Sequence, residues 1–171
     1  MKYNPDKHHR QSIRLKGYDY TQPGAYGVTI VTKDRLCLLG EITNGEMVLS
    51  SYGIIAQRTW LDLPDHYPHI ALDEFVIMPN HVHGIIVLTH SDRSQTDSCQ
   101  RNALSEIIRA FKSFSARRIN ILRHTPGVPV WQRNYYEHII RSENKLRHAR
   151  IYIANNPTEW ERDHENPLVI R

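Results

Sequence analysis

The residues of this chain with the clearest chemical potential are two histidines, His81 and His83, in the stretch F-V-I-M-P-N-H-V-H-G-I-I-V-L (75–88). Side chains alternate between the two faces of a strand, so both imidazoles project the same way, and Val82 and Gly84 face the opposite side. The apolar flanks indicate a buried hairpin, where adjacent imidazoles are costly unless they are hydrogen-bonded or bind a metal. The pattern predicts a divalent cation on this pair; the alternative is two core histidines bonded to backbone groups.

A second group of reactive side chains lies on the last predicted helix, 142–155. Tyr152 lies four residues after His148 and four before Asn156, so these three side chains share one face of the helix. A different stripe can pack on a sheet: Leu146, Ala149 and Ile153. The phenol of Tyr152 is therefore presented and not buried. The alternative is an interfacial tyrosine whose hydroxyl belongs to a polar network.

Basic residues follow the predicted helix at 104–122 and the segment after it. The stripe on the helix consists of Arg109, Lys112 and Arg123, with Arg117 at its edge. Such a stripe can follow a phosphate backbone. The segment 130–141, V-W-Q-R-N-Y-Y-E-H-I-I-R, adds Arg133 and Arg141 to aromatic side chains, a composition suited to stacking unpaired bases. Trp131 and Tyr135 fit a core position equally well.

The charge of the chain is unevenly distributed, although its formal net value is only +4. Residues 101–150 hold eleven Lys and Arg against three acids, whereas residues 34–75 hold two arginines against seven acids. One electropositive side would attract a polyanion such as nucleic acid. The alternative is that these charges form solvated helix faces.

The length of 171 residues predicts a single domain, 1–171. No stretch reaches the roughly 18 to 20 apolar residues that cross a bilayer, and the N-terminus has no apolar signal-peptide core. We therefore expect a cytoplasmic, nucleoid-associated protein without membrane contact. Cys37 and Cys99 are too few for a disulfide framework and are expected to be free thiols.

Periodicity and β-branched composition predict the elements that position these residues. Strands are expected at 25–32, 70–77, 83–88 and 135–140, helices at 48–63, 104–122 and 142–155, and a flexible loop at 89–102. Ser142 is the expected N-cap of the last helix, and Pro157 follows its end. The order β, α, β, β, α, β, α indicates an α+β fold of the ferredoxin-like, split βαβ class. That class has an antiparallel sheet with helices packed mainly on one face.

Together these segments resemble the REP-associated branch of the single-tyrosine HUH transposases, from about residue 10 to residue 160. The stretches that carry the resemblance, in this order, are R-Q-S-I-R-L-K-G-Y-D-Y (10–20), M-P-N-H-V-H-G-I-I (78–86), I-I-R-A-F-K-S-F (107–114), W-Q-R-N-Y-Y-E-H-I-I-R (131–141) and Y-I-A-N-N-P (152–157). The ordered set is far more specific than any one stretch.

The resemblance implies His81 and His83 as the catalytic histidines, Tyr152 as the nucleophile and Asn156 as a further metal ligand. It also implies magnesium or manganese as cofactor, and single-stranded DNA with imperfect hairpins as substrate. The product would be a 5′-phosphotyrosine with a free 3′-hydroxyl, which permits rejoining. A homodimer is a possible assembly.

Two other functions remain open on the sequence. One is a domesticated protein that binds DNA or RNA hairpins without cutting them. The other is a metal-dependent phosphoesterase that uses water as its nucleophile, which would make Tyr152 dispensable. The intact set of His81, His83 and Tyr152 favours the strand transferase.

Overall fold

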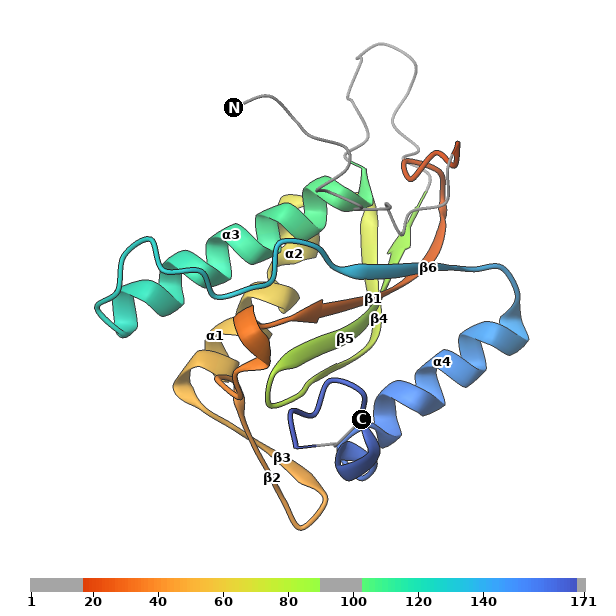
Figure 1. The fold of residues 1–171 in the computed structure, drawn as a ribbon. Helices are drawn as coiled ribbons and strands as arrows, with labels where there is room; N and C mark the ends of the chain where they lie inside the picture. Colours follow the sequence, from red (N-terminus) through yellow and green to blue (C-terminus); the bar gives the residue numbers. More distant parts are fainter. Residues whose placement is uncertain (1–16, 90–102, 169–171) are drawn as a thin grey trace, which may run out of the picture.

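Four strands form one antiparallel sheet in the order β4-β5-β1-β6 in the computed structural model, which describes residues 17–89 and 103–168 (Figure 1). The strands are β1 (Gly24–Val31), β4 (Ile70–Ile77), β5 (His81–Leu88) and β6 (Tyr136–Ile140). The central strands β1 and β5 pair along their whole length, from Gly24 opposite Leu88 to Val31 opposite His81. This sheet, with helices in both strand-to-strand crossovers, confirms the predicted fold class.

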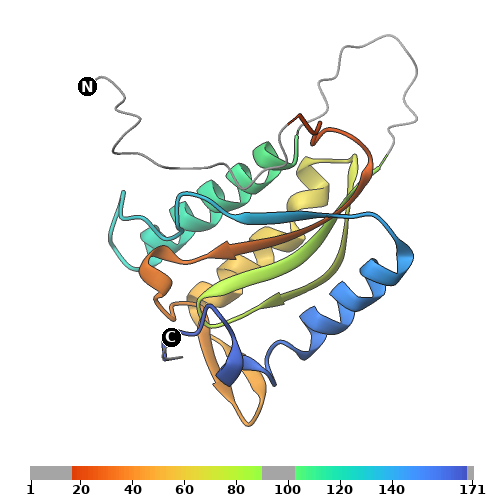
Figure 2. The ribbon, with the colours of Figure 1, turned by 45° about the vertical axis from the view of Figure 1, so that its right-hand side comes forward.

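Helices cover both faces of the sheet, unequally. The helices α1 (Ser51–Leu61) and α3 (Leu104–Leu122), with the short α2 (Leu63–His66), lie on one face. The helix α4 (Glu143–Asn155) lies on the other face (Figure 2). The expectation of helices mainly on one face thus holds for α1, α2 and α3, which lie in the two crossovers, and not for α4. The position of α4 defines the second face, toward which the histidine pair points.

Two apolar clusters follow the alternation of side chains along the strands. The larger joins Tyr26, Val82 and Ile86 of the sheet to Trp60 of α1 and Phe111 of α3. The smaller lies under α4 and contains Ile85, Ile140 and Ile153, with Leu146 and Ala149 packed against it. The two stripes predicted on the last helix are therefore confirmed, because its apolar stripe faces the sheet. Each cluster is stabilised by the removal of apolar surface from water.

The helix expected at 48–63 begins later than predicted. Residues 46–49 are a strand, β3 (Glu46–Leu49), paired with β2 (Gly40–Thr43) in a separate hairpin. Asn44 and Gly45 turn this hairpin with φ angles of 54° and 78°, the left-handed backbone of a tight hairpin turn. The helix α1 then starts at Ser51, with Ser50 as its N-cap. The Asn-Gly pair in the sequence was the signal that distinguished this hairpin from a longer helix.

The other boundaries are close to those predicted. Ser142 caps α4 by accepting a hydrogen bond from the Lys145 amide at 3.3 Å. Apart from Thr89, the loop predicted at 89–102 lies outside the described residues, as does Cys99. Within the described ranges, no helix is both long enough and apolar enough to cross a membrane.

Candidate metal and tyrosine site

The two histidines lie at the start of β5 and point to the face that α4 covers. Their ring centroids are 4.4 Å apart, and both Val82 and Gly84 face the opposite cluster. His81 is fully buried, and its Nε2 has no hydrogen-bond partner among the residues that the structure describes. A buried nitrogen without a partner is costly, and a bound cation would remove that cost.

Burial keeps both imidazoles neutral. The pKa of His81 is lowered well below its ordinary value, mainly by burial and then by repulsion from His83. The pKa of His83 falls to about 4, again mainly because of burial. Metal ligation requires the neutral imidazole, whose free nitrogen carries a lone pair. The histidine pair is therefore in the protonation state that a metal site needs.

Hydrogen bonds fix both rings. Asn80 Oδ1 is 2.9 Å from His81 Nδ1, and Asn80 Nδ2 donates to the carbonyls of Arg35 and Glu165 at 3.1 Å and 2.6 Å. Because Nδ2 is committed to two carbonyls, Oδ1 must accept from His81 Nδ1, which leaves Nε2 with the lone pair. His83 Nδ1 is bonded to Thr29 Oγ1 at 2.8 Å. Hydrogen bonds to the ring nitrogen that does not bind the metal orient metal-binding histidines.

Asp163 completes a group of three possible ligands that the sequence analysis missed. One ligand atom from each of His81, His83 and Asp163 lies within 4.8 Å of the others, and all three residues are buried. Asp163 Oδ2 is 3.9 Å from His81 Nε2, close to the roughly 3 to 4 Å that separates two ligands of one small cation. A carboxylate adds the negative charge that Mg²⁺ and Mn²⁺ favour.

The C-terminal segment that carries Asp163 is held against the start of β5. Glu165 accepts a hydrogen bond from Arg35 at 2.7 Å, and its carbonyl accepts the one from Asn80. The ring of Trp160, in the turn η2 (Trp160–Arg162), lies 6.1 Å from that of His81. Figure 1 shows this segment beside the β4-β5 turn. No spacing motif joins Asp163 to the histidine motif, so only the fold reveals the contact.

Asn156 also lies in this site. It is buried, its Nδ2 donates to Asp163 Oδ2 at 3.2 Å, and its Oδ1 has no partner among the described side chains and backbone. Asn156 Oδ1 and His81 Nε2 are both buried and unpaired, and a cation bound by both would remove that cost. The sequence-predicted set of His81, His83 and Asn156 is thus brought together, and its metal ligation stays a prediction.

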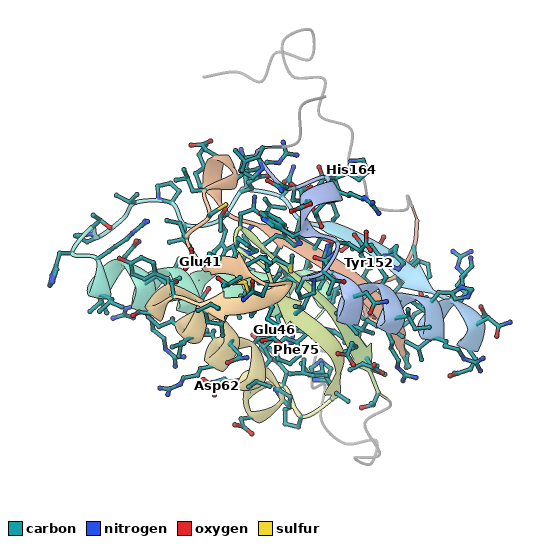
Figure 3. The ribbon with its side chains drawn as sticks, turned by 90° about the horizontal axis from the view of Figure 1, so that it is seen from below. Glu41, Glu46, Asp62, Phe75, Tyr152 and His164 are labelled. Atoms are coloured by element: carbon teal, nitrogen blue, oxygen red, sulfur yellow. The ribbon has the colours of Figure 1, made fainter. Side chains whose placement is uncertain are left out.

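Tyr152 lies on α4 (Figure 3) and contacts the histidine pair through His83. Its ring centroid is 5.4 Å from that of His83, and its side chain is 56% exposed. Partial burial raises the pKa of the phenol, and so does the negative charge of Asp163. The tyrosine is therefore protonated at neutral pH and needs a nearby positive charge to act as a nucleophile.

The predicted nucleic-acid-binding residues are not gathered at this site. Arg109 and Arg117 lie on α3, which covers the opposite face of the sheet from Tyr152. Arg133 precedes β6 and Arg141 follows it, at the edge of the sheet. All four side chains are exposed. A strand bound by all of them would have to pass around the edge formed by β6.

Two basic residues of the predicted stripe have other partners. Lys112 donates through Nζ to the carbonyls of Gln132, Arg133 and Asn134, and burial lowers its pKa to about 8. Arg123 donates to Asn120 Oδ1 and to the Val128 carbonyl. The ammonium group of Lys112 is bonded to the segment before β6, and its contact with DNA stays a prediction. Helical periodicity gives the face of a side chain but not its neighbours.

The aromatic residues of the segment 130–141 are divided between core and surface. Trp131 is buried, and its Nε1 donates to Ser115 Oγ at 2.9 Å. Tyr135 is partly buried against the larger cluster, whereas the Tyr136 side chain is 51% exposed. Trp131 and Tyr135 are therefore core residues, the alternative that the sequence left open.

Two curated proteins are similar to this chain in sequence. The chain is 40% identical over 172 residues to an uncharacterized protein of Haemophilus influenzae, covering 95% of this chain and 96% of that one. It is 24% identical over 144 residues to a second Haemophilus influenzae protein, provisionally named a REP-associated tyrosine transposase, covering 82% of this chain and 74% of that protein. No family model matches.

Two solved structures share the fold. A REP-associated tyrosine transposase bound to a REP hairpin superposes with a TM-score of 0.61 at 21% identity, covering 86% of this chain and 73% of the other. A provisionally assigned transposase of Deinococcus radiodurans superposes with a TM-score of 0.50 at 20% identity, covering 83% of this chain and 97% of that one.

The fold is shared with a solved REP-associated tyrosine transposase, and the resemblance seen in the sequence is confirmed. The chain belongs to one family with the uncharacterized Haemophilus influenzae protein, with which it aligns over nearly its whole length.

Proposed function

We propose that the protein is a metal-dependent strand transferase that cuts and rejoins single-stranded DNA through Tyr152. The observation that carries this proposal is the position of Tyr152, whose ring lies 5.4 Å from that of His83. The same histidine belongs to the buried group with His81 and Asp163. A phenol beside a buried group of metal ligands fits phosphoryl transfer to tyrosine.

The reaction forms one bond and breaks another at the same phosphorus. The phenol oxygen of Tyr152 attacks the scissile phosphate in line with the 3′ oxygen, and the bond between phosphorus and that oxygen breaks. The phenol loses a proton and the departing 3′ oxygen gains one, both exchanged with solvent. The products are a 5′-phosphotyrosine and a free 3′-hydroxyl, and the reverse reaction joins the strand to a new 3′ end without ATP.

His81, His83 and Asp163 would hold a divalent cation, magnesium or manganese, and Asn156, bonded to Asp163, has an unpaired buried Oδ1 that could add a ligand. When bound, the cation supplies positive charge that stabilises the phosphate oxygens in the transition state. The protein contributes the orientation of the rings through Asn80 and Thr29. It also holds the phenol of Tyr152 at the rim of the site.

The proposed substrate is single-stranded DNA that carries hairpins, as the hairpin-bound transposase of similar fold suggests. Exposed arginines on α3 and at both ends of β6 would contact the phosphates of such a strand: Arg109, Arg117, Arg133 and Arg141. Phosphate contacts contribute electrostatic affinity and not sequence preference. These residues would therefore hold the hairpin away from the cut, while Tyr152 acts on the strand beside it.

The test is the formation of a covalent protein–DNA adduct. Purified protein is incubated with labelled hairpin-bearing single strands and Mn²⁺ or Mg²⁺, and the products are separated on a denaturing gel. We expect a slowly migrating adduct that needs the metal and is lost in Tyr152→Phe. The matched control is Tyr136→Phe, because Tyr136 is exposed to a similar degree, 51% against 56%.

The two alternative functions, a phosphoesterase and a hairpin-binding protein, predict different band patterns on the gel. Cleavage without an adduct would indicate a phosphoesterase with a water nucleophile. Binding without cleavage would indicate a protein that only holds hairpins. Either result, obtained with folded protein and added metal, would overturn the proposal.

A further inference from the structure

A cavity of about 490 Å³ lies between α4 and the strands β1, β5 and β6, and reaches His83 and Tyr152 at one end. The candidate metal site explains the residues at that end, and the rest of the cavity has no role in it. Its apolar wall comes from Gly27 and Ile85 of the sheet and from Ala149 and Ile153 of α4, and its polar wall comes from His138, Lys145 and His148. The volume is within the range of roughly 300 to 1,000 Å³ of small-molecule sites.

Gly27 allows His138 to form part of the wall of this cavity. The two residues are opposite each other in the pairing of β1 with β6, and the imidazole of His138 lies directly over the glycine. A Cβ atom at position 27 would be 2.2 Å from His138 Cε1, so any other residue would displace the ring. Because Gly27 has no side chain, the His138 ring lies against the backbone and forms this wall of the cavity.

The charges around the cavity suit an anion that carries a flat ring. Lys145, His148 and Tyr152 lie on one face of α4, at intervals of three and four residues, and lead from the outer rim to the metal site. Among the described residues that line the cavity, none is acidic. Lys145 with the imidazole of His148 can bind a phosphate, and the His138 ring and Ala149 can receive a base.

We propose that this cavity binds the nucleotide next to the scissile phosphate, with its base between the His138 ring, which covers Gly27, and Ala149. The far phosphate of that nucleotide is bound by Lys145 and His148. The proposal rests on the function proposed above, because it makes the cavity part of the same DNA path. With one phosphate of the nucleotide at Lys145 and His148, its other phosphate, the scissile one, would lie at Tyr152.

The test is a titration of isotope-labelled full-length protein, without metal, followed by nuclear magnetic resonance. The probes are the four 2′-deoxynucleoside 5′-monophosphates, the corresponding deoxynucleosides and inorganic phosphate. We expect at least one monophosphate to shift the signals of Gly27, His138 and Ala149 saturably. Inorganic phosphate should shift the signals of Lys145 and His148 but leave those of Gly27 and Ala149 in place.

A charge-matched pair of variants tests the phosphate contact. Lys145→Ala should weaken binding of that monophosphate by about fivefold, the upper end for an exposed ion pair. Arg147→Ala removes the same charge from the same helix at a residue outside the cavity, and should change the affinity by less than about twofold. Both residues are exposed, so neither change disturbs the core.

The outcomes separate this inference from the proposed function. If the adduct of Tyr152 forms but no monophosphate moves the cavity signals, the cavity inference is wrong and the strand transferase stands. Equal shifts from inorganic phosphate and from the monophosphates would exclude a base site. If monophosphates bind but no adduct forms on any strand, the placement of this nucleotide beside a scissile phosphate is wrong.

Discussion

The side chain of Asn80 fixes the tautomer of the residue that follows it, His81. Its Nδ2 donates to the carbonyls of Arg35 and Glu165, so its Oδ1 accepts from His81 Nδ1 at 2.9 Å. His81 Nε2 is left buried with a lone pair and 3.9 Å from Asp163 Oδ2. One amide thus connects the ring of a metal-ligand candidate to the segment that supplies Asp163.

Replacing Asn80 should weaken metal binding without removing a ligand. We expect Asn80→Ala to lower Mn²⁺ affinity by about 10- to 100-fold, as for other outer contacts of metal-binding histidines. The reason is that the variant no longer fixes the tautomer of His81 and no longer donates a hydrogen bond to the Glu165 carbonyl. Isothermal titration calorimetry with Mn²⁺ measures the effect, at a temperature where circular dichroism shows the variant folded. Unchanged Mn²⁺ affinity would show that the hydrogen bond has no part in the site.

The third ligand can be identified by comparing two substitutions. Asp163→Asn keeps the size of the side chain but removes its charge, and should lower Mn²⁺ affinity more than Asn156→Ala does. A carboxylate contributes charge that an amide oxygen lacks, and hard divalent cations favour it. Isothermal titration calorimetry with Mn²⁺ shows which of the two variants has the lower affinity. The opposite order would assign the third position to Asn156, as the sequence predicted.

The attachment of α4 to the sheet should depend on pH. Asp73 accepts two hydrogen bonds from Arg150 on α4, at 2.8 Å and 2.7 Å, and these lower the pKa of Asp73 below its ordinary value of 3.8. A lowered folded-state pKa gives stability that is present above the unfolded value and is lost as the pH falls through the folded one. Glu143 and Glu74 also act on Arg150.

Asp73→Asn should therefore lower the melting temperature at pH 7 and have little effect near pH 2. Thermal unfolding of both proteins across this range gives the difference directly. The control is Glu143→Gln, which removes a weaker and more exposed partner of Arg150, 3.8 Å away, and should change the melting temperature less at pH 7. An equal loss for Asp73→Asn at both pH values would mean that the ion pair does not stabilise this attachment.

Lys112 should contribute to folding and not to DNA affinity. Its Nζ binds carbonyls of the segment before β6, so Lys112→Ala should cost about 1 to 3 kcal/mol of unfolding free energy. Arg109→Ala, on the exposed side of the same helix, should stay within about 0.5 kcal/mol. Urea unfolding measures both values. A larger loss in the arginine variant would reverse the assignment of the two side chains.

The sequence predicted the parts of this fold that depend on local periodicity. Alternation along 75–88 placed both histidines on one face, and the stripes of the last helix placed Tyr152 on a presented face and Leu146, Ala149 and Ile153 on the sheet. Asp163 could not be predicted, because its position depends on contacts of Arg35 and Asn80 with Glu165, residues far apart in the chain. The hairpin at 40–49 was missed although Asn44 and Gly45 signalled it, because the apolar residues after the turn also fit helical spacing.

The central claim, that Tyr152 is the nucleophile, can be tested at the level of one peptide. Trypsin cuts after Arg150 and Arg162, and the peptide between them contains Tyr152 as its only tyrosine. The adduct formed with Mn²⁺ is digested with nuclease and trypsin and analysed by mass spectrometry. We predict a nucleotide mass on Tyr152 in this peptide. A nucleotide on the peptide that carries Tyr135 and Tyr136, or cleaved DNA with no modified tyrosine, would contradict the account.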